Sequence, residues 1–283
     1  SYGRLGISQP SSPFYKNIGN FELQMWSGYS PNENIILNPD TNEYSWQYNY
    51  FDGFNTSSEL VDINGDGFLD LMTLDMNPKD YIRSKTTMSM TSISKFTDMV
   101  NKGYHYQYMH NVLQLNNGNG SFSEIANMAG MANTDWSWAP LIADFDLDGL
   151  NDIYITNGVF RDVIDKDTNK NILNLIRQKR RKPSSKEFLE YTQMLPQQKL
   201  SNYFFKNQGD LTFSNVSELW HNASPTFSNG AVYADLDNDG DLDIVVNNIN
   251  EEAHILRNNT VEREKKHFLN FNFKGPENNP FGI

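Results

Sequence analysis

The chain has 283 residues, which is long enough for one large or two ordinary domains, and its 13% aromatic residues can support a packed core. A net charge of −12 and a pI near 4.8 argue against nucleic acid as the main partner, because phosphate binding requires a basic surface. The absence of cysteine excludes disulfide stabilisation. No apolar run reaches the length of a membrane span, and because the chain starts at Ser1 without a signal peptide or initiator methionine, we expect an internal piece of a longer protein.

Short apolar segments that end in asparagine recur along the chain. They are Phe14–Asn17, Leu113–Asn116, Phe204–Asn207 and Ile255–Asn258. The second and third continue through turn residues, at 117–122 and 208–213, into another apolar residue. This pattern is typical of strands joined by tight turns, so the sequence predicts four strands and two hairpins.

An acidic segment of nine residues occurs three times, at 62–70, 144–152 and 235–243. Each copy has oxygen-bearing side chains at positions 1, 3, 5 and 9 and glycine at position 6. Ca²⁺ binds about six to eight oxygen atoms, and alternate side chains of a tight loop point inward to supply them. Glycine permits the turn that directs the next carbonyl at the ion. The predicted side-chain ligands are Asp62, Asn64, Asp66, Asp70, Asp144, Asp146, Asp148, Asp152, Asp235, Asp237, Asp239 and Asp243.

The three segments are not EF-hands. An EF-hand loop ends in a bidentate glutamate at position 12, where this chain has Thr73, Ile155 and Val246. Those residues lie in short apolar runs that predict strands, so the loops join strands. One such segment could be a plain acidic turn, but three copies in one register favour metal binding.

The spacing of these markers predicts the architecture. Asn116 and Asp144 are 28 residues apart, as are Asn207 and Asp235, and an uninterrupted unit from Asn207 to Asn258 spans 51. A unit of this length with several short strands matches a blade of a β-propeller. The predicted fold class is therefore all-β: about three propeller blades plus part of a fourth within 1–260, a fragment of a larger ring of about 4–8 blades. Calcium loops join the strands, and the blades carry α-helical insertions.

The insertions follow the first two loops, near 77–109 and 159–201. Apolar residues at helical spacing from Ser92 to a stop at Gly103 predict a short surface helix in the first insertion. In the second insertion, Ser184 and Glu187 offer a capping box for a helix that follows the apolar run 172–176.

A basic run, Arg177–Lys182, lies between the two helical segments of the second insertion. The acidic chain and the lack of interleaved aromatic residues favour a solvated helix end or a partner contact over a nucleic-acid site.

Aromatic residues are concentrated at Tyr104–Tyr108 and at Trp136 and Trp138. A ligand platform or a sugar-stacking site is one interpretation. We favour packing against strands, because aromatic residues at strand edges usually pack between layers.

No catalytic arrangement is evident. The histidines follow no spacing typical of a metal site or a catalytic triad; they are His105, His110, His221, His254 and His267. A Ser/His/Asp catalytic triad built from residues distant in sequence remains an alternative, although no feature of the sequence requires one.

The three loops, with the segment Leu113–Phe122 between two of them, resemble the FG-GAP/VCBS repeat, the calcium-loop blade also found in integrin α-subunit propellers. The segments 266–275 and 279–283 resemble the opening of an ASPIC/UnbV domain, which suggests that 261–283 starts such a β domain. The segments 75–78, 106–109 and 134–138 resemble large surface lipoproteins of Bacteroidota that carry both domains.

The resemblance implies a secreted or surface-anchored propeller with structural metals. It adds the position-7 carbonyls as ligands, those of Phe68, Leu150 and Asp241. Because Asn64 replaces an acid, the first loop is expected to bind calcium most weakly.

The function expected from these features is non-catalytic binding by a calcium-stabilised extracellular module, with a protein partner. The bacterial resemblance suggests an outer-membrane nutrient-uptake complex of the SusC/SusD type. The alternatives are a glycan-binding or adhesion module, a polysaccharide-processing enzyme, and an RNA-binding protein that uses the basic run Arg177–Lys182.

Overall fold

A computed structural model describes residues 32–38, 43–49, 57–87, 93–103, 109–221, 224–264 and 274–275; only the backbone is described for the first two ranges. The predicted strand Phe14–Asn17, the aromatic run Tyr104–Tyr108 and most of the predicted domain 261–283 lie outside these residues.

Three antiparallel sheets repeat one arrangement, in which each strand pairs with the next of its sheet. Blade I contains β3 (Ser57–Val61), β4 (Asp70–Leu74), β6 (Val112–Asn116) and β7 (Phe122–Glu124). Blade II contains β8 (Asp135–Ala143), β9 (Asp152–Asn157), β10 (Tyr203–Asn207) and β11 (Phe213–Asn215). Blade III contains β12 (Ser228–Ala234), β13 (Asp243–Asn248) and β14 (His254–Leu256). The strands predicted after each acidic loop and the hairpins predicted after Asn116 and Asn207 are confirmed.

Two further pairings lie outside this repeat. A hairpin that the sequence analysis did not predict, β1 (Asn32–Asn38) with β2 (Glu43–Asn49), precedes blade I. The short strand β5 (Met76–Asn77) follows β4 but pairs with β8, so it links blade I to blade II.

The helices lie in the insertions and at the blade ends. The first insertion contains α1 (Tyr81–Thr87) and α2 (Ile93–Asn101), and the second contains α4 (Lys166–Lys179) and α5 (Ser185–Gln193). Short helices follow the last strand of each blade: α3 (Ala126–Ala129), α6 (Ser217–Trp220) and α7 (Thr260–Glu264). The predicted helix before Gly103 and the capping box of Ser184 with Glu187 are confirmed, whereas α1, α3, α6 and α7 were not predicted.

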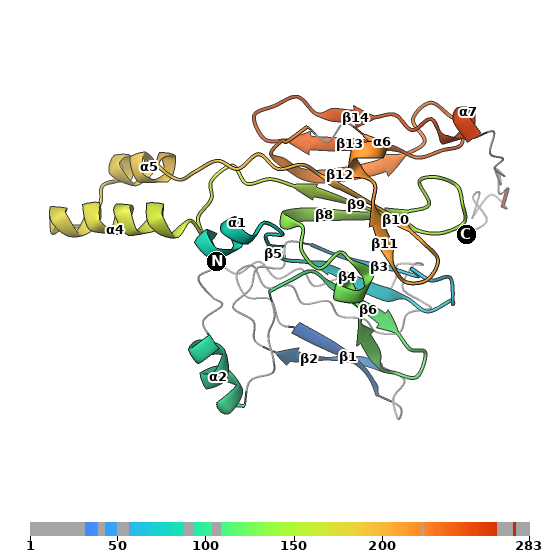
Figure 1. Cartoon of the computed structure of the whole chain (residues 1–283), viewed down its shortest axis with the longest axis horizontal. Coiled ribbons are helices and arrows are strands. Elements are labelled where there is room, and N and C mark those ends of the chain that lie inside the picture. The colour runs from blue at the N-terminus through green and yellow to red at the C-terminus, as the bar shows by residue number, and fades with distance from the viewer. Residues whose placement is uncertain are drawn as a thin grey trace.

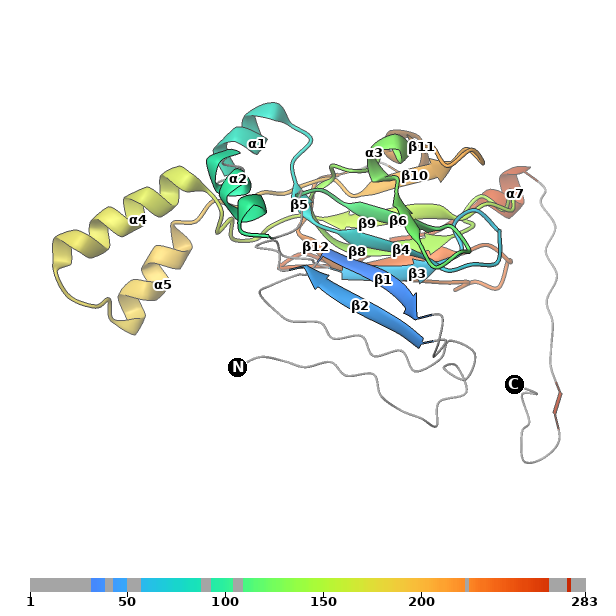
Figure 2. The ribbon, with the colours of Figure 1, turned by 90° about the horizontal axis from the view of Figure 1, so that it is seen from below.

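The blades are stacked in chain order. The first strands lie side by side, since β3 contacts β8 and β8 contacts β12. Figures 1 and 2 show the sheets fanned in the order I, II, III, with α4 and α5 projecting away from them. This is the fold of part of a β-propeller.

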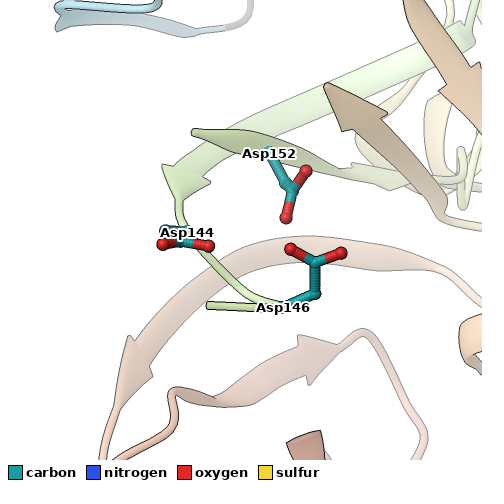
Figure 3. A group of neighbouring side chains, drawn as sticks. All are labelled: Asp144, Asp146 and Asp152. Carbon is teal, nitrogen blue, oxygen red and sulfur yellow. The ribbon is translucent and has the colours of Figure 1, made fainter. Parts of the chain in front are cut away.

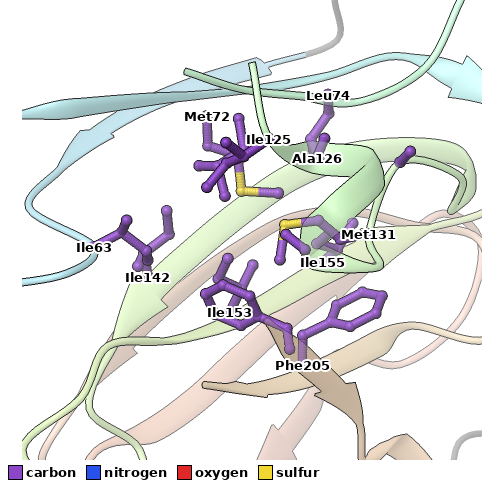
Figure 4. Packing of buried hydrophobic residues seen from close by; sticks show 14 residues of the cluster. Ile63, Met72, Leu74, Ile125, Ala126, Met131, Ile142, Ile153, Ile155 and Phe205 are labelled. Carbon is purple, nitrogen blue, oxygen red and sulfur yellow. The ribbon is translucent and has the colours of Figure 1, made fainter. Parts of the chain in front are cut away.

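Both faces of blade II are buried, since the sheet lies between blades I and III. Alternate residues of each strand point to opposite faces and so enter different cores. Ile153 and Ile155 of β9 pack in the core shared with blade I, together with Met72 and Leu74 (Figure 4). Tyr154, between them, packs in the core shared with blade III. This arrangement explains the apolar run that follows the second acidic loop.

In blades I and II, one cross-strand row of side chains faces the next blade. In blade II, Leu141 and Phe204 flank Tyr154, and all three are buried. The same positions in blade III are Val232, Val245 and Ile255, paired in the same register. Val232 is 59% exposed and Ile255 is 68% exposed. An apolar packing row of blade III therefore faces outward from the part of the chain that the structure describes.

Trp136 and Trp138 pack against neighbouring elements, as the sequence analysis favoured. Trp136 is buried and clusters with Met76 and Val159, and the half-buried Trp138 packs against this cluster. The indole N–H of Trp138 donates to the carbonyl of Gly158 at 2.6 Å. These two residues do not form the exposed groove that a sugar-stacking site requires.

Candidate metal centres

The three acidic loops have the same internal hydrogen bonds. In the second loop, the carboxylate of Asp144 accepts hydrogen bonds from the N–H groups of Asp148 at 3.0 Å and Gly149 at 2.9 Å. Asp148 in turn accepts from the N–H of Leu150 at 3.0 Å. Equivalent bonds shape the first and third loops. The backbone thus curls around the carboxylate at position 1, and this curl turns the acidic side chains of the loop toward one another.

Positive φ angles produce this curl at two positions. Glycine occupies position 6, with φ of 87° at Gly67 and 92° at Gly149. The residue at position 4 also has a left-handed backbone conformation, although it is not glycine in the second loop (Leu147) or the third (Asn238). The sequence analysis identified position 6 but missed position 4, because leucine there gives no signal for a positive φ.

The position-9 aspartate fastens each loop to the blade. Asp152 is fully buried, and its two oxygens accept from the N–H of Phe145 at 3.2 Å and of Asn207 at 2.9 Å. Asp70 and Asp243 make the same pair of bonds.

The marker asparagines of blades II and III join neighbouring loops. Asn207 ends β10, whereas Asn258 lies just after β14, and Asn116 of blade I donates to the carbonyl of Leu69 in its own loop. The side-chain amide of Asn207 donates to the carbonyl of Ile63, in the loop of blade I, and to that of Asn151, in its own loop. Asn258 does the same with Phe145 and Leu242. The sequence analysis recognised these asparagines as markers, but only the structure shows that those of blades II and III bridge blades.

The structure brings some of the predicted ligands together. Oxygens of Asp144, Asp146 and Asp152 lie within 4.8 Å of one another, and Figure 3 shows the carboxylates of Asp146 and Asp152 turned toward each other. A second group of this kind consists of Asp235, Asp237 and Asp239. Asp148 and Asp243 lie outside these two groups.

The first loop forms no such acidic group among the described residues. Asn64 replaces one acid, and its amide donates to Asp66 at 2.9 Å. Asp62 and Asp66 receive the same backbone hydrogen bonds as their equivalents in the other loops.

A basic side chain from the same blade contacts the second and third loops. The ammonium of Lys206 contacts Asp146, and it also contacts Asp148 at 2.7 Å. Arg257 occupies the equivalent place and lies 2.7 Å from Asp237. In blade I the equivalent residue is Leu115. The sequence analysis missed these contacts, whose only signal is a basic residue directly before the marker asparagine.

Two observations indicate that a cation fits the second loop. Burial, aided by the charge of Asp146, raises the pKa of Asp152 to about 7, although hydrogen bonds from Asn207 and Phe145 and the charge of Lys206 oppose this. The Oδ1 atom of Asp146 is buried and accepts no hydrogen bond. Clustered carboxylates with an unsatisfied oxygen are the donor set that a hard divalent cation binds.

Asp241 has a place that the sequence analysis did not predict. It was expected to offer its carbonyl, but its side chain is fully buried and accepts from the N–H of Val261 at 3.0 Å. The carboxylate also groups with those of Asp239 and Glu262, which Arg257 contacts.

A pocket outside the acidic loops is a further candidate binding site. It has a volume of about 200 Å³, lies between blades II and III, and is lined by Phe204, Trp220 and His221 together with Asp146 and Glu264. Among the described residues, no helix is both long and apolar enough to span a bilayer.

The stacked blades and their acidic loops define a repeat protein of the β-propeller type. Residues 99–155 and 197–246 match the sequence profile of the FG-GAP-like repeat. The second and third loops fall within these ranges; the first loop and the segment 261–283 do not. No curated protein matches the chain.

Proposed function

We propose that the protein is a calcium-stabilised, extracellular binding module without catalytic activity. The single observation that carries the metal assignment is the buried, unsatisfied oxygen of Asp146 within a carboxylate cluster whose loop geometry recurs three times. Similarity to FG-GAP-like repeats supports an extracellular or cell-surface location and a binding or adhesion role.

Calcium is the ion that this ligand set favours, since it accepts oxygen ligands in flexible geometry. The side chains of positions 1, 3, 5 and 9 and the carbonyl of position 7 would hold it. A bound ion offsets repulsion between the carboxylates, and because position 9 also bonds the marker asparagine, the ion would stiffen the contact between blades.

A protein partner is supported by the outward row of Val232, Val245 and Ile255, which has the register of a packing face. The resemblance to bacterial surface lipoproteins leads us to propose an outer-membrane partner, for example a nutrient-uptake complex of the SusC/SusD type. For the same reason we propose that 261–283 begins an ASPIC/UnbV domain.

The test is thermal unfolding of the full chain with calcium and with chelator, alongside metal analysis of the purified protein. Calcium at about 100 times its dissociation constant should stabilise the fold by about 2.7 kcal/mol per site. Asp146→Asn and Asp237→Asn give the second and third loops the asparagine that the first loop already has, and neither removes a backbone hydrogen bond of the loop. Each should weaken calcium binding, whereas Glu190→Gln, on the exposed face of α5, should not.

Protein that contains no metal and is not stabilised by calcium would show that the loops are acidic turns, and the proposal would be withdrawn. Bound metal that chelator cannot remove would instead indicate tight structural sites.

A further inference from the structure

The helical hairpin of α4 and α5, residues 166–193, has a charge opposite to that of the rest of the protein. It carries eight basic and three acidic side chains, a net charge of +5. The whole chain carries −12, so the remainder carries −17. Opposite charges are therefore segregated between the projecting hairpin and the blades.

The turn of the hairpin is held by one acid. Glu187 caps α5 through Ser184 and pairs with Lys179 at 2.6 Å and Arg181 at 2.7 Å. Among the described residues, no carboxylate lies within ion-pair distance of five further basic side chains of the hairpin, which are exposed: Lys170, Arg177, Arg180, Lys182 and Lys186. The turn thus presents unneutralised positive charge in a fixed shape.

Exposed apolar side chains lie on the same hairpin. Phe188 is 62% exposed, Leu189 is 58% exposed and Leu173 is 51% exposed. No residue of α4 is buried, and of α5 only Tyr191 is. Large apolar side chains beside basic ones are the composition of helices that lie in a lipid–water interface.

The position of the hairpin allows such a contact. Figures 1 and 2 show α4 and α5 extending beyond the sheets, and α4 touches the rest of the protein through α1. The side chain of Lys166 anchors this base by donating to the carbonyl of Lys85 at 3.1 Å. An anionic surface would attract the hairpin and repel the acidic blades, which fixes one orientation.

We propose that the α4–α5 hairpin docks on an anionic lipid surface, with its basic side chains at the phosphate headgroups and Phe188 and Leu189 in the interface. Charge complementarity selects an anionic partner. The exposed apolar side chains select lipid over RNA, which would need aromatic residues interleaved with the basic ones. This inference is independent of the metal loops.

The experiment is cosedimentation of the full chain with vesicles of phosphatidylcholine, alone or mixed with phosphatidylglycerol, in calcium and in chelator. We expect salt-sensitive binding to the mixed vesicles only, in both buffers. The triple variant Arg180→Gln, Lys182→Gln, Lys186→Gln should bind about a hundredfold more weakly, because each basic residue near such a surface contributes severalfold. The matched control Lys79→Gln, Lys102→Gln, Arg263→Gln removes the same charge elsewhere and should bind like the natural sequence.

A second variant separates the apolar contribution from the charge. Phe188→Ser with Leu189→Ser should weaken vesicle binding and leave its salt dependence unchanged. These side chains are exposed, so circular dichroism and the unfolding temperature should match those of the natural sequence.

Several outcomes would overturn the proposal. The natural sequence could fail to bind mixed vesicles, or the triple variant and its control could bind equally. If single-stranded RNA, but not vesicles, binds in a salt-dependent way that the triple variant abolishes, the hairpin is a nucleic-acid site instead.

Discussion

The side-chain amide of Asn207 donates a hydrogen bond to the carbonyl of Ile63 at 3.2 Å, although the two residues are 144 positions apart. The bond joins the last residue of β10 to the acidic loop of the preceding blade. Asn258 makes the equivalent bond to Phe145 at 2.7 Å. A single side chain therefore couples each candidate metal loop to its neighbour.

Loss of this bridge should destabilise the packing of one blade on another. Asn207→Ala leaves the carbonyls of Ile63 and Asn151 without their donor and should lower the free energy of unfolding by about 1–3 kcal/mol in urea titrations. Asn247→Ala, at an exposed position of β13, is the control and should change it by less than about 0.5 kcal/mol. Equal losses in the two variants would show that the bridge contributes nothing specific.

Lys206 acts as a tethered cation in the second loop, where it contacts Asp146 and Asp148. Lys206→Met should raise the calcium affinity of that loop about tenfold, since a competing charge is removed. In chelator the same variant should be less stable, because the carboxylates then repel without compensation. Isothermal titration calorimetry and thermal unfolding measure the two effects.

The control for this prediction is Lys199→Met, since Lys199 pairs with Glu251 away from the loops. In the first blade, Leu115→Lys should have the converse effect and weaken calcium binding. Unchanged affinity in Lys206→Met would mean that the ammonium does not compete with the ion.

Equivalent positions of the packing row should respond differently to truncation. Leu141 is buried between blades II and III, whereas Val232 is 59% exposed. Leu141→Ala should cost about 2–5 kcal/mol, and Val232→Ala less than about 0.5 kcal/mol. If Val232→Ala proves as costly, the outward face of blade III is covered in solution.

Glu59 should make stability depend on pH. Burial raises its pKa from 4.5 to about 7, so the folded state favours the neutral acid. The stabilisation from this group is complete below pH 4.5 and is lost as the pH rises through about 7. Because the side chain is only partly buried, we discount the effect to about 1 kcal/mol.

Glu59→Gln tests this dependence. The variant should lose less stability than the natural sequence between about pH 5 and pH 8 in denaturant titrations. Glu190→Gln, which alters an exposed residue, should follow the natural sequence. Parallel pH profiles for all three proteins would exclude a role for Glu59.

The sequence by itself determined the blades and the acidic loops, because both depend on local patterns. Alternating apolar residues specify strands, glycine and asparagine specify turns, and the loop acids recur at a spacing that local geometry requires. The second helix of the second insertion followed from a capping box, which is also a local interaction.

The tertiary structure alone decided how these elements combine. Three examples are the bridge from Asn207 to Ile63, the contact of Lys206 with the second loop and the packing of Trp136 against Met76 and Val159. Each brings together residues that are distant in sequence. Their partners depend on how one blade stacks on the next, and no local pattern encodes that geometry. The exposure of the row of Val232 and Ile255 depends on stacking for the same reason, since the equivalent row in blade II is buried only by its neighbour.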